Sequence, residues 1–291
     1  MPPLIVIVGE TASGKTALAF ELAKKFNGEI ISADSWAVYK EFTIGTAKPS
    51  VDELAQVQHH AIDVADPLDG YSAVLFQQQA RQAIDTIVAR GKIPILAGGT
   101  GLYVDSVIYD YGFLPASDPD LRTELNAMTH EQVLQRAHDM KLDMYDIDVR
   151  NKRRVIRLIE NNGKRPTKGP LRANTLILGV HANREALADR VALRTDAMLA
   201  AGLEQEVHKL SEKYGWDVEP MKGVGYAQWR EYFAGTQSLD ETRARIIKAT
   251  LDLAKRQRTW FKRNKSIQWL TASNKSEQAV ELVATFLGTL R

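Results

Sequence analysis

The segment GETASGKT, from Gly9 to Thr16, constrains the fold of this chain more than any other part of the sequence. It fits the pattern G-x-x-x-x-G-K-[ST], follows a short apolar run at Leu4–Val8, and precedes a stretch of helical spacing at Thr16–Phe26. A strand, a glycine-rich turn and a helix in this order predict a phosphate-binding loop, because backbone N–H groups and the helix N-terminus then point at phosphate oxygens. Lys15 is expected to neutralise the outer phosphate, and the Thr16 hydroxyl is expected to reach Mg²⁺.

Further strands alternate with helices along the chain. Short apolar runs predict strands at Glu29–Ala33, Ile93–Ala97 and Thr175–Val180, and apolar spacing predicts a helix at Leu75–Arg90. Such alternation is typical of α/β proteins, in which helices cover both faces of a parallel sheet. The predicted fold is therefore a P-loop NTPase-like parallel sheet core flanked by helices.

The strand pattern disappears between Leu114 and Asn174, where the sequence is polar and helical in character. We therefore predict a catalytic core formed by residues 1–114 and 175–291, with a helical insertion domain at 115–174. A long helix is expected from Ser238, because SLDE there forms a capping box.

Composition and charge narrow the possible functions. The chain has 291 residues, no cysteine and a formal net charge of +2, so disulfides, a Cys-ligated zinc and a thiol nucleophile are all excluded. With so small a net charge, any affinity for nucleic acid must come from clustered basic residues. No signal peptide or membrane span is evident, so we expect a cytoplasmic protein with no membrane partner, and a monomer by default.

The acid that an NTPase normally places at the end of a buried strand is missing, since IPILAGGT ends in glycines and a threonine. The nearest carboxylate is Asp34, at the end of the second predicted strand, and it should face the same crevice as Lys15. Asp34 could hold Mg²⁺ through water, accept a proton from a nucleophile, or simply cap a turn. The pattern alone leaves these roles open.

Six motifs occur in an order that resembles the tRNA dimethylallyltransferases, the MiaA-type tRNA isopentenyltransferases. They are GETASGKT, ISADS, IGTAKP (Ile44–Pro49), GGTGLY (Gly98–Tyr103), VGY (Val224–Tyr226) and AKRQRTWF (Ala254–Phe261). The resemblance runs from about Leu4 to Trp269. It implies that dimethylallyl diphosphate is the phosphate ligand, with Mg²⁺ as cofactor. It also implies that the allyl unit passes to N6 of the adenosine 3′-adjacent to the anticodon in the tRNA anticodon stem-loop, with diphosphate as the leaving group.

The resemblance also implies roles for individual residues. Asp34, Thr100 and Lys15 would be catalytic, with Asp34 removing the proton of the adenine amine. Thr16 would bind Mg²⁺. The diphosphate would be held by Gly9, Thr11, Ala12, Ser13, Gly14, Lys15 and Thr16.

Contacts to tRNA are implied in both the core and the insertion. The expected residues are Asp34, Ser35, Trp36, Ala37, Thr100, Arg122, Arg153, Arg154, Arg157 and Lys222. We also expect Arg150, Arg153, Arg154 and Arg157 to lie along one side of a helix. The AKRQRTWFKR segment should place Phe261 in the core and some of its basic residues on RNA phosphates. Trp36 and Ala37 stand where the family commonly has polar residues, and Ala227 and Leu251-Asp252 also depart from it. These departures leave the leaving-group site intact and alter the expected RNA contacts.

Three other functions fit parts of the pattern. A small-molecule P-loop kinase would share the loop but would bind ATP and transfer phosphate. An adenylate isopentenyltransferase would use the same donor with free nucleotide and would not need the basic insertion. A nucleotide-gated RNA-binding module would have no use for Asp34. The adjacent His59 and His60 lack a further ligand at metal spacing, so we interpret them as structural or ligand-adjacent.

Overall fold

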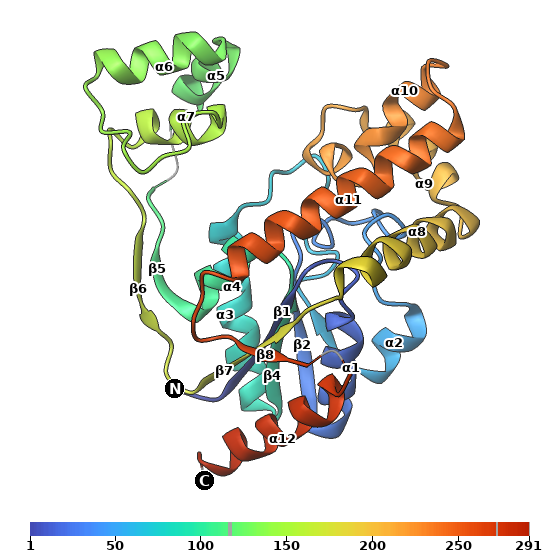
Figure 1. Ribbon diagram of the computed structural model, residues 1–291. Helices are drawn as coiled ribbons and strands as arrows, with labels where there is room; N and C mark the ends of the chain where they lie inside the picture. The colour runs from blue at the N-terminus through green and yellow to red at the C-terminus, as the bar shows by residue number, and fades with distance from the viewer. Residues whose placement is uncertain (116–117, 272, 291) are drawn as a thin grey trace. The chain divides into compact units, whose positions relative to one another are not determined.

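The computed structural model describes residues 1–115, 118–271 and 273–290, apart from the side chains of residues 184 and 185. The chain divides into two compact units, one formed by Met1–Ile108 with Leu171–Arg291 and the other by Tyr109–Pro170. Each is described by itself below (Figure 1).

The larger unit is an α/β domain built on a six-stranded sheet. Its strands are β1 (Leu4–Gly9), β2 (Gly28–Ala33), β3 (His59–His60), β4 (Ile93–Gly98), β7 (Thr175–Val180) and β8 (Gln268–Leu270). They lie in the order β3-β2-β4-β1-β7-β8, and all the neighbouring pairs are parallel. The predicted parallel sheet core is confirmed, although its two short edge strands were not predicted.

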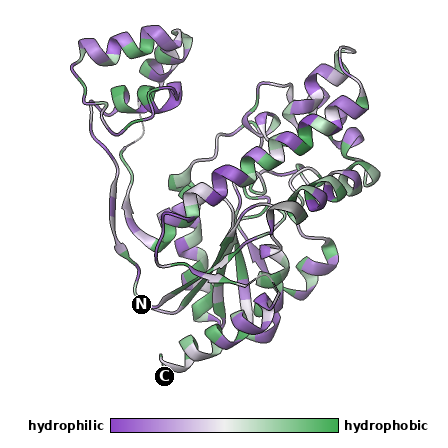
Figure 2. Ribbon diagram, in the orientation of Figure 1, coloured by the Kyte–Doolittle hydropathy of each residue, from purple (hydrophilic) through white to green (hydrophobic). Residues whose placement is uncertain are grey.

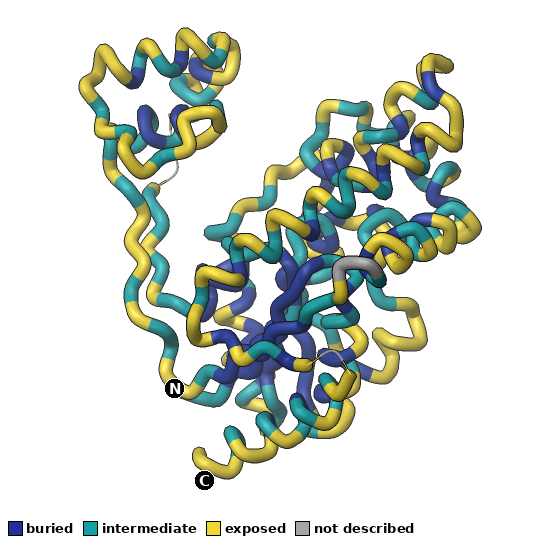
Figure 3. Tube along the Cα trace, viewed as in Figure 1, coloured by how far each residue is buried: buried dark blue, intermediate teal, exposed yellow. Residues whose placement is uncertain are grey.

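Helices cover both faces of this sheet. They are α1 (Lys15–Lys25), α2 (Val51–Gln56), α3 (Ala73–Ala89), α4 (Gly101–Ile108), α8 (Arg184–Ala200), α9 (Leu203–Tyr214), α10 (Arg230–Phe233), α11 (Leu239–Phe261) and α12 (Lys275–Gly288), with two 3₁₀ turns, η1 (Glu219–Lys222) and η2 (Ala227–Trp229). One face contacts α1 and α12, and the other contacts α3, α4 and α11. Such coverage explains why β1 is buried along its whole length. Figure 3 shows the central strands as buried, and Figure 2 shows that they are mainly hydrophobic.

The long helix α11 begins where the capping box predicted. Ser238 accepts a hydrogen bond from the Glu241 N–H, and the Glu241 side chain accepts one from the Ser238 N–H in return. The helix reaches Phe261, which is buried as expected. None of the helices among the described residues is long and apolar enough to cross a membrane.

The smaller unit has its own apolar core. It contains β5 (Tyr109–Gly112), α5 (Pro119–Ala127), α6 (His130–Asp139), α7 (Lys152–Glu160) and β6 (Thr167–Leu171), which ends at the unit boundary. The core is formed by Leu125, Val133, Ala137, Val155, Ile156 and Ile159, at helical spacing on the three helices. Strands β5 and β6 pair with each other, so the prediction that this region lacks strands was wrong. The polar sequence TKGPL of β6 gives no apolar signal from which to predict it.

Candidate active site at the phosphate-binding loop

The loop Gly9–Thr16 has the geometry of a phosphate-binding turn. Gly14 caps α1 with a φ of 90°, and Ala12 also adopts a positive φ of 59°. A Cβ on Gly9 would lie 2.5 Å from the Val180 carbonyl oxygen, so only glycine fits where β1 meets β7. The loop therefore follows β1 directly and opens α1, as the sequence predicted.

Lys15 stands near the end of this loop, as the first residue of α1. Its Nζ donates a hydrogen bond to the Glu10 carbonyl at 3.3 Å. The pKa of Lys15 is lowered to about 8, chiefly by burial; the positive charge of Arg194 acts in the same direction, whereas the charges of Asp34 and Glu10 partly offset the shift. An anion bound to the loop would replace the lost hydration and stabilise the protonated amine.

A cavity opens between the phosphate-binding loop and the C-terminal ends of β2 and β4. Its polar lining includes Thr11, Lys15, Thr16, Asp34, Lys48 and Arg194, and small apolar side chains such as Ala37, Ala47 and Ala97 complete the wall. We call it the phosphate-side cavity. It places two lysines, an arginine, threonine hydroxyls and a carboxylate within one small volume, at the edge of the sheet where ligands of open α/β folds bind.

Asp34 is held in a tight turn directly after β2. Its Oδ1 accepts hydrogen bonds from the Trp36 N–H at 2.9 Å and the Ala37 N–H at 3.4 Å. The turn-capping role left open by the sequence is therefore real, and it orients the carboxylate. Because both bonds use Oδ1 and Asp34 also lines the cavity, capping is compatible with a chemical role for this residue.

Thr100 and Ser35 join the ends of β2 and β4. The Thr100 Oγ1 accepts a hydrogen bond from the Ser35 N–H at 3.1 Å and lies 3.3 Å from the Ser35 Oγ, and the Thr100 N–H donates to the Ala33 carbonyl. Two residues predicted to be functional are thus brought next to Asp34. Gly98 also faces Ala33 so closely that no Cβ would fit there.

A second cavity meets the first one. It is lined by Trp36, by Val224 and Gly225, and by side chains of α8 and α11 such as Val191, Met198, Ile246 and Leu253; we call it the helix-side cavity. Thr11, Asp34, Thr46 and Arg194 line both cavities. Asp34 and Arg194 therefore stand at the junction of a polar and a more apolar compartment.

Arg194 is a site residue that the sequence analysis missed. It projects from α8, and its Nη1 lies 3.4 Å from the Thr11 Oγ1. Burial lowers the pKa of Arg194, and the charge of Asp34 partly offsets this effect. Leu187 and Val191, which are buried, stand seven and three positions earlier on the helix, so a charged residue at a core-facing position was the available signal.

Two residues of α11 bind the phosphate-binding loop, and the sequence analysis identified neither of them in this role. The Gln257 Oε1 accepts a hydrogen bond from the Thr11 N–H at 2.7 Å. Arg258 Nε donates to the buried Glu10 carboxylate at 2.6 Å. Arg258 therefore supports the loop from α11, and the expectation that some basic residues of this segment meet RNA phosphates remains a prediction.

The remaining core residues expected to contact tRNA differ in accessibility. Trp36 lines the helix-side cavity, with its ring against Gly223. Ala37 is buried in the wall of the phosphate-side cavity, whereas Lys222 is half-exposed and lies 3.5 Å from the Glu219 carboxylate. His60 pairs with Glu29 at 2.7 Å, and His59 contacts the Val57 carbonyl and also lines the phosphate-side cavity, so one is structural and the other adjoins the site.

The smaller unit carries the basic cluster. Arg153 and Arg154 are exposed on α7, while Arg122 and Arg157 both contact Glu160, whose side chain is 0% exposed. The expectation that Arg150 lies on the same helix was wrong, because Asn151 caps α7 and Arg150 binds Asp148 before the helix begins. Two of the four predicted arginines of this unit thus share one buried carboxylate.

The donor atoms present fit a magnesium ion that is bound together with phosphate. Within the part of the chain that the structure describes, there is no group of three or more His, Cys, Asp or Glu residues that could hold a metal alone. The phosphate-side cavity instead offers the Thr16 hydroxyl and the Asp34 carboxylate. Mg²⁺ commonly takes one or two protein oxygens and completes its shell with phosphate and water.

A parallel sheet, a phosphate-binding loop at the end of β1 and a cavity that joins the loop to Asp34 define an α/β protein of the P-loop type. The family model of IPP transferases matches residues 37–264, and the chain belongs to this family. The curated relatives that match this chain over nearly its whole length are transferases, so this chain is a transferase as well.

Similar proteins cover nearly the whole chain. A tRNA dimethylallyltransferase of Bacillus cytotoxicus is 38% identical over 99% of this chain and 96% of its own length. Another, from Acetivibrio thermocellus, is 39% identical over 99% of this chain and 98% of its own length. Among solved structures, the tRNA isopentenylpyrophosphate transferase of Bacillus halodurans is 33% identical, with a TM-score of 0.78 over 99% of this chain and 98% of that protein. A eukaryotic dimethylallyltransferase acting on tRNA has a TM-score of 0.82 at 26% identity, over 99% of this chain and 80% of that protein.

Proposed function

We propose that this protein transfers a dimethylallyl group from dimethylallyl diphosphate to N6 of the adenosine 3′-adjacent to the anticodon in tRNA, and releases diphosphate. The observation that carries the proposal is the position of Asp34, which lines both the cavity at the phosphate-binding loop and the adjoining helix-side cavity. The family membership and the names of the relatives support the same reaction.

The diphosphate would lie against the loop amides of Gly9, Thr11, Ala12, Ser13, Gly14, Lys15 and Thr16. Lys15 and Arg194 would add positive charge where negative charge develops as the C–O bond breaks. The electron pair of that bond leaves with the diphosphate. Bound Mg²⁺, held by Thr16, would supply further neutralisation of the leaving group.

The acceptor adenine would enter through the helix-side cavity. Trp36 there offers an aromatic face on which a base that has left the anticodon loop can stack. The N6 lone pair is delocalised into the ring, so the amine is a weak nucleophile that attacks once the allyl carbon is electron-poor. As the C–N bond forms, Asp34 takes the N6 proton on Oδ2, while Oδ1 keeps its bonds to the turn.

Thr100 and Ser35 support this arrangement from the neighbouring strand end. Their mutual hydrogen bonds fix the turn that carries Asp34, and the Thr100 hydroxyl lies where it can assist at the base or the leaving group. In the smaller unit, Arg122, Arg153, Arg154 and Arg157 would bind phosphates of the anticodon stem-loop, with Lys222 contributing from the core. A cytoplasmic monomer remains our expectation.

A transfer assay tests the proposal directly. Purified protein, Mg²⁺, dimethylallyl diphosphate and bulk tRNA should yield N6-isopentenyladenosine, detected by mass spectrometry of the nucleosides. Equal transfer to free AMP would favour an adenylate isopentenyltransferase, and phosphate transfer from ATP would favour a kinase. Either result would overturn the proposed acceptor or the proposed reaction.

A further inference from the structure

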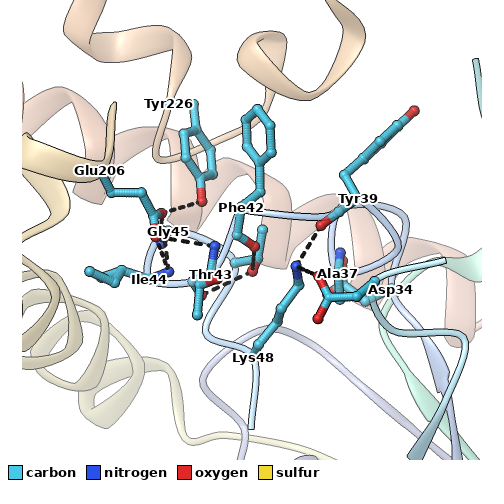
Figure 4. A network of polar contacts seen from close by, with 12 residues as sticks. Asp34, Ala37, Tyr39, Phe42, Thr43, Ile44, Gly45, Lys48, Glu206 and Tyr226 are labelled. Carbon is cyan, nitrogen blue, oxygen red and sulfur yellow. Dashed lines mark hydrogen bonds and ion pairs between the residues drawn. The ribbon is translucent and has the colours of Figure 1, made fainter. Parts of the chain in front are cut away.

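Two motifs with no role in the chemistry described above, IGTAKP and VGY, meet at one carboxylate. Three successive backbone N–H groups, those of Thr43, Ile44 and Gly45, converge on the side chain of Glu206 (Figure 4). The N···O distances are 3.2 Å from Thr43 and 2.8 Å from Ile44 to Oε2, and 3.1 Å from Gly45 to Oε1. Glu206 comes from α9, more than 160 residues further along the chain.

Tyr226 adds a fourth donor to the Glu206 carboxylate. Its hydroxyl donates a hydrogen bond to the Glu206 Oε1 at 2.7 Å, and its buried ring packs on Phe42 with centroids 4.9 Å apart. A Cβ on Gly45 would lie 2.5 Å from the Tyr226 Cζ, so the ring rests directly on the glycine backbone. The Glu206 carboxylate therefore accepts four donors, three of them from the backbone of one segment.

The segment held in this way, residues 43–49, forms walls of both cavities. Thr46, Ala47, Lys48 and Pro49 line the phosphate-side cavity, and Gly45 and Thr46 line the helix-side cavity. The segment has no helix or strand of its own, so its shape depends on side-chain contacts such as those of Glu206. At the other end, the Lys48 ammonium binds the Tyr39 carbonyl and lies 2.7 Å from Asp63.

We infer that Glu206 is a positioning residue for prenyl transfer, which fixes segment 43–49 as the cavity wall that holds the allyl group next to Asp34. The inference rests on the proposed function, because it assigns the substrate that the wall confines. Glu206 itself lines neither cavity. A wall displaced by a fraction of an ångström would leave diphosphate binding intact and misalign the reacting carbon with the amine.

The decisive experiment compares Glu206→Gln with Glu204→Gln. Glu204 lies two residues earlier on α9 and accepts a hydrogen bond from the Tyr232 hydroxyl at 2.9 Å. Glu204→Gln therefore removes the same charge from the helix away from the cavities, while the amide oxygen can still accept that bond. Glutamine keeps the shape of Glu206 but turns an NH₂ donor toward N–H groups that need an acceptor. We expect kcat to fall roughly tenfold in Glu206→Gln. The Kd for inorganic pyrophosphate, measured by calorimetry, should stay within about twofold, and Glu204→Gln should match the wild type.

Hydrogen exchange gives a second measurement that does not depend on activity. The amides of Thr43, Ile44 and Gly45 should exchange faster in Glu206→Gln, while those of the phosphate-binding loop should not change. Tyr226→Phe, which removes one donor and leaves the carboxylate, should give a smaller change in the same direction. Glu206→Gln and Tyr226→Phe are mild changes, so they test the positioning role of Glu206 even if a truncation such as Glu206→Ala fails to fold.

Two results would overturn the inference. One is an unchanged kcat with unchanged exchange at residues 43–45, and the other is a loss of pyrophosphate binding equal to the loss of kcat, which would indicate a general disruption of the site. Absence of prenyl transfer in the wild-type protein would refute the proposed function instead, while the exchange experiment would still report on the contact.

Discussion

The Glu10 carboxylate and the Arg258 guanidinium are paired at 2.6 Å, across 248 positions of sequence. Glu10 stands within the phosphate-binding loop, and Arg258 stands near the end of α11. Beside this pair, Gln257 accepts the Thr11 N–H, and Trp260 packs against Gly101 at the start of α4. Helix α11 therefore contacts and positions both the phosphate-binding loop and the segment after β4 that contains Thr100.

The first prediction concerns the stability of this pair. The Glu10 side chain is only 1% exposed, so Arg258→Met would leave a buried carboxylate without its counter-charge. Breaking a buried ion pair from one side costs about 3–5 kcal/mol, and we expect a loss of that order in the free energy of unfolding measured in urea. The double variant Glu10→Gln/Arg258→Met should recover part of the loss. If the single variant is as stable as the wild type, the pair does not support the loop.

The second prediction concerns pH. Because the pKa of Lys15 is lowered to about 8, the empty loop loses positive charge as the pH rises through 8, and diphosphate affinity should fall there. A bound anion raises that pKa again, so binding at pH 8.5 should be accompanied by proton uptake. Calorimetry in buffers of different ionisation enthalpy measures this uptake.

The unfolded chain keeps the Lys15 proton up to about pH 10.5, so Lys15 should also make the free energy of unfolding rise between pH 8 and 10.5.

Lys15→Arg is the matched control for this experiment, since arginine stays protonated throughout the range. The part of the proton uptake that is due to Lys15 should be lost in the variant, and the difference between the two proteins isolates it because both bind the same pyrophosphate. Equal proton uptake in both proteins would contradict the assignment to Lys15.

The third prediction separates the two roles of Asp34. Asparagine keeps an oxygen that can accept the Trp36 and Ala37 N–H groups, so Asp34→Asn should preserve the turn and remove only the base. Transfer should then slow by about 10²–10⁴-fold with pyrophosphate binding nearly unchanged. Asp34→Ala, which also loses the turn bonds, should be destabilised in addition. A fully active Asp34→Asn would favour a role without proton transfer.

The parts of the site that the sequence revealed are those whose chemistry is local. The loop Gly9–Thr16 and Asp34 each follow a strand, and the strand itself places them at the ligand-binding edge of the sheet. Arg194, Glu10 and Gln257 act through contacts with residues far away in sequence, and no local pattern specifies such partners. Only the charge of Arg194 at a core-facing helix position offered a signal.

In the fold, too, the elements with a local sequence pattern were predicted, and those that depend on contacts with distant segments were not. The buried strands β1, β4 and β7 are mainly apolar runs, β2 carries Ile30, Ile31 and Ala33 beside Glu29 and Ser32, and all four were predicted. The edge strands β3 and β8 have two and three residues, too few for any periodicity, and they exist because a neighbouring strand offers free backbone groups. Arg150 was misplaced because Asn151 caps α7 only one position later, which basic spacing alone does not reveal.

The last prediction concerns the arginines of the smaller unit. Arg157 and Arg122 share the fully buried Glu160 carboxylate, which offsets part of their charge, whereas Arg154 is exposed. Arg154→Gln should weaken tRNA binding and reduce the slope of log K against log salt by about 1, with the free energy of unfolding within about 0.5 kcal/mol of wild type. Arg157→Gln should change the slope less and destabilise the unit more, because Glu160 then has one partner fewer. Fluorescence anisotropy over 50–200 mM salt measures the slopes.

Arg136, which pairs with the exposed Glu124, provides a control arginine of the same unit, and Arg136→Gln should alter neither the salt slope nor the free energy of unfolding. Equal slopes for the Arg154 and Arg157 variants would show that Glu160 does not offset the charge that Arg157 presents to RNA.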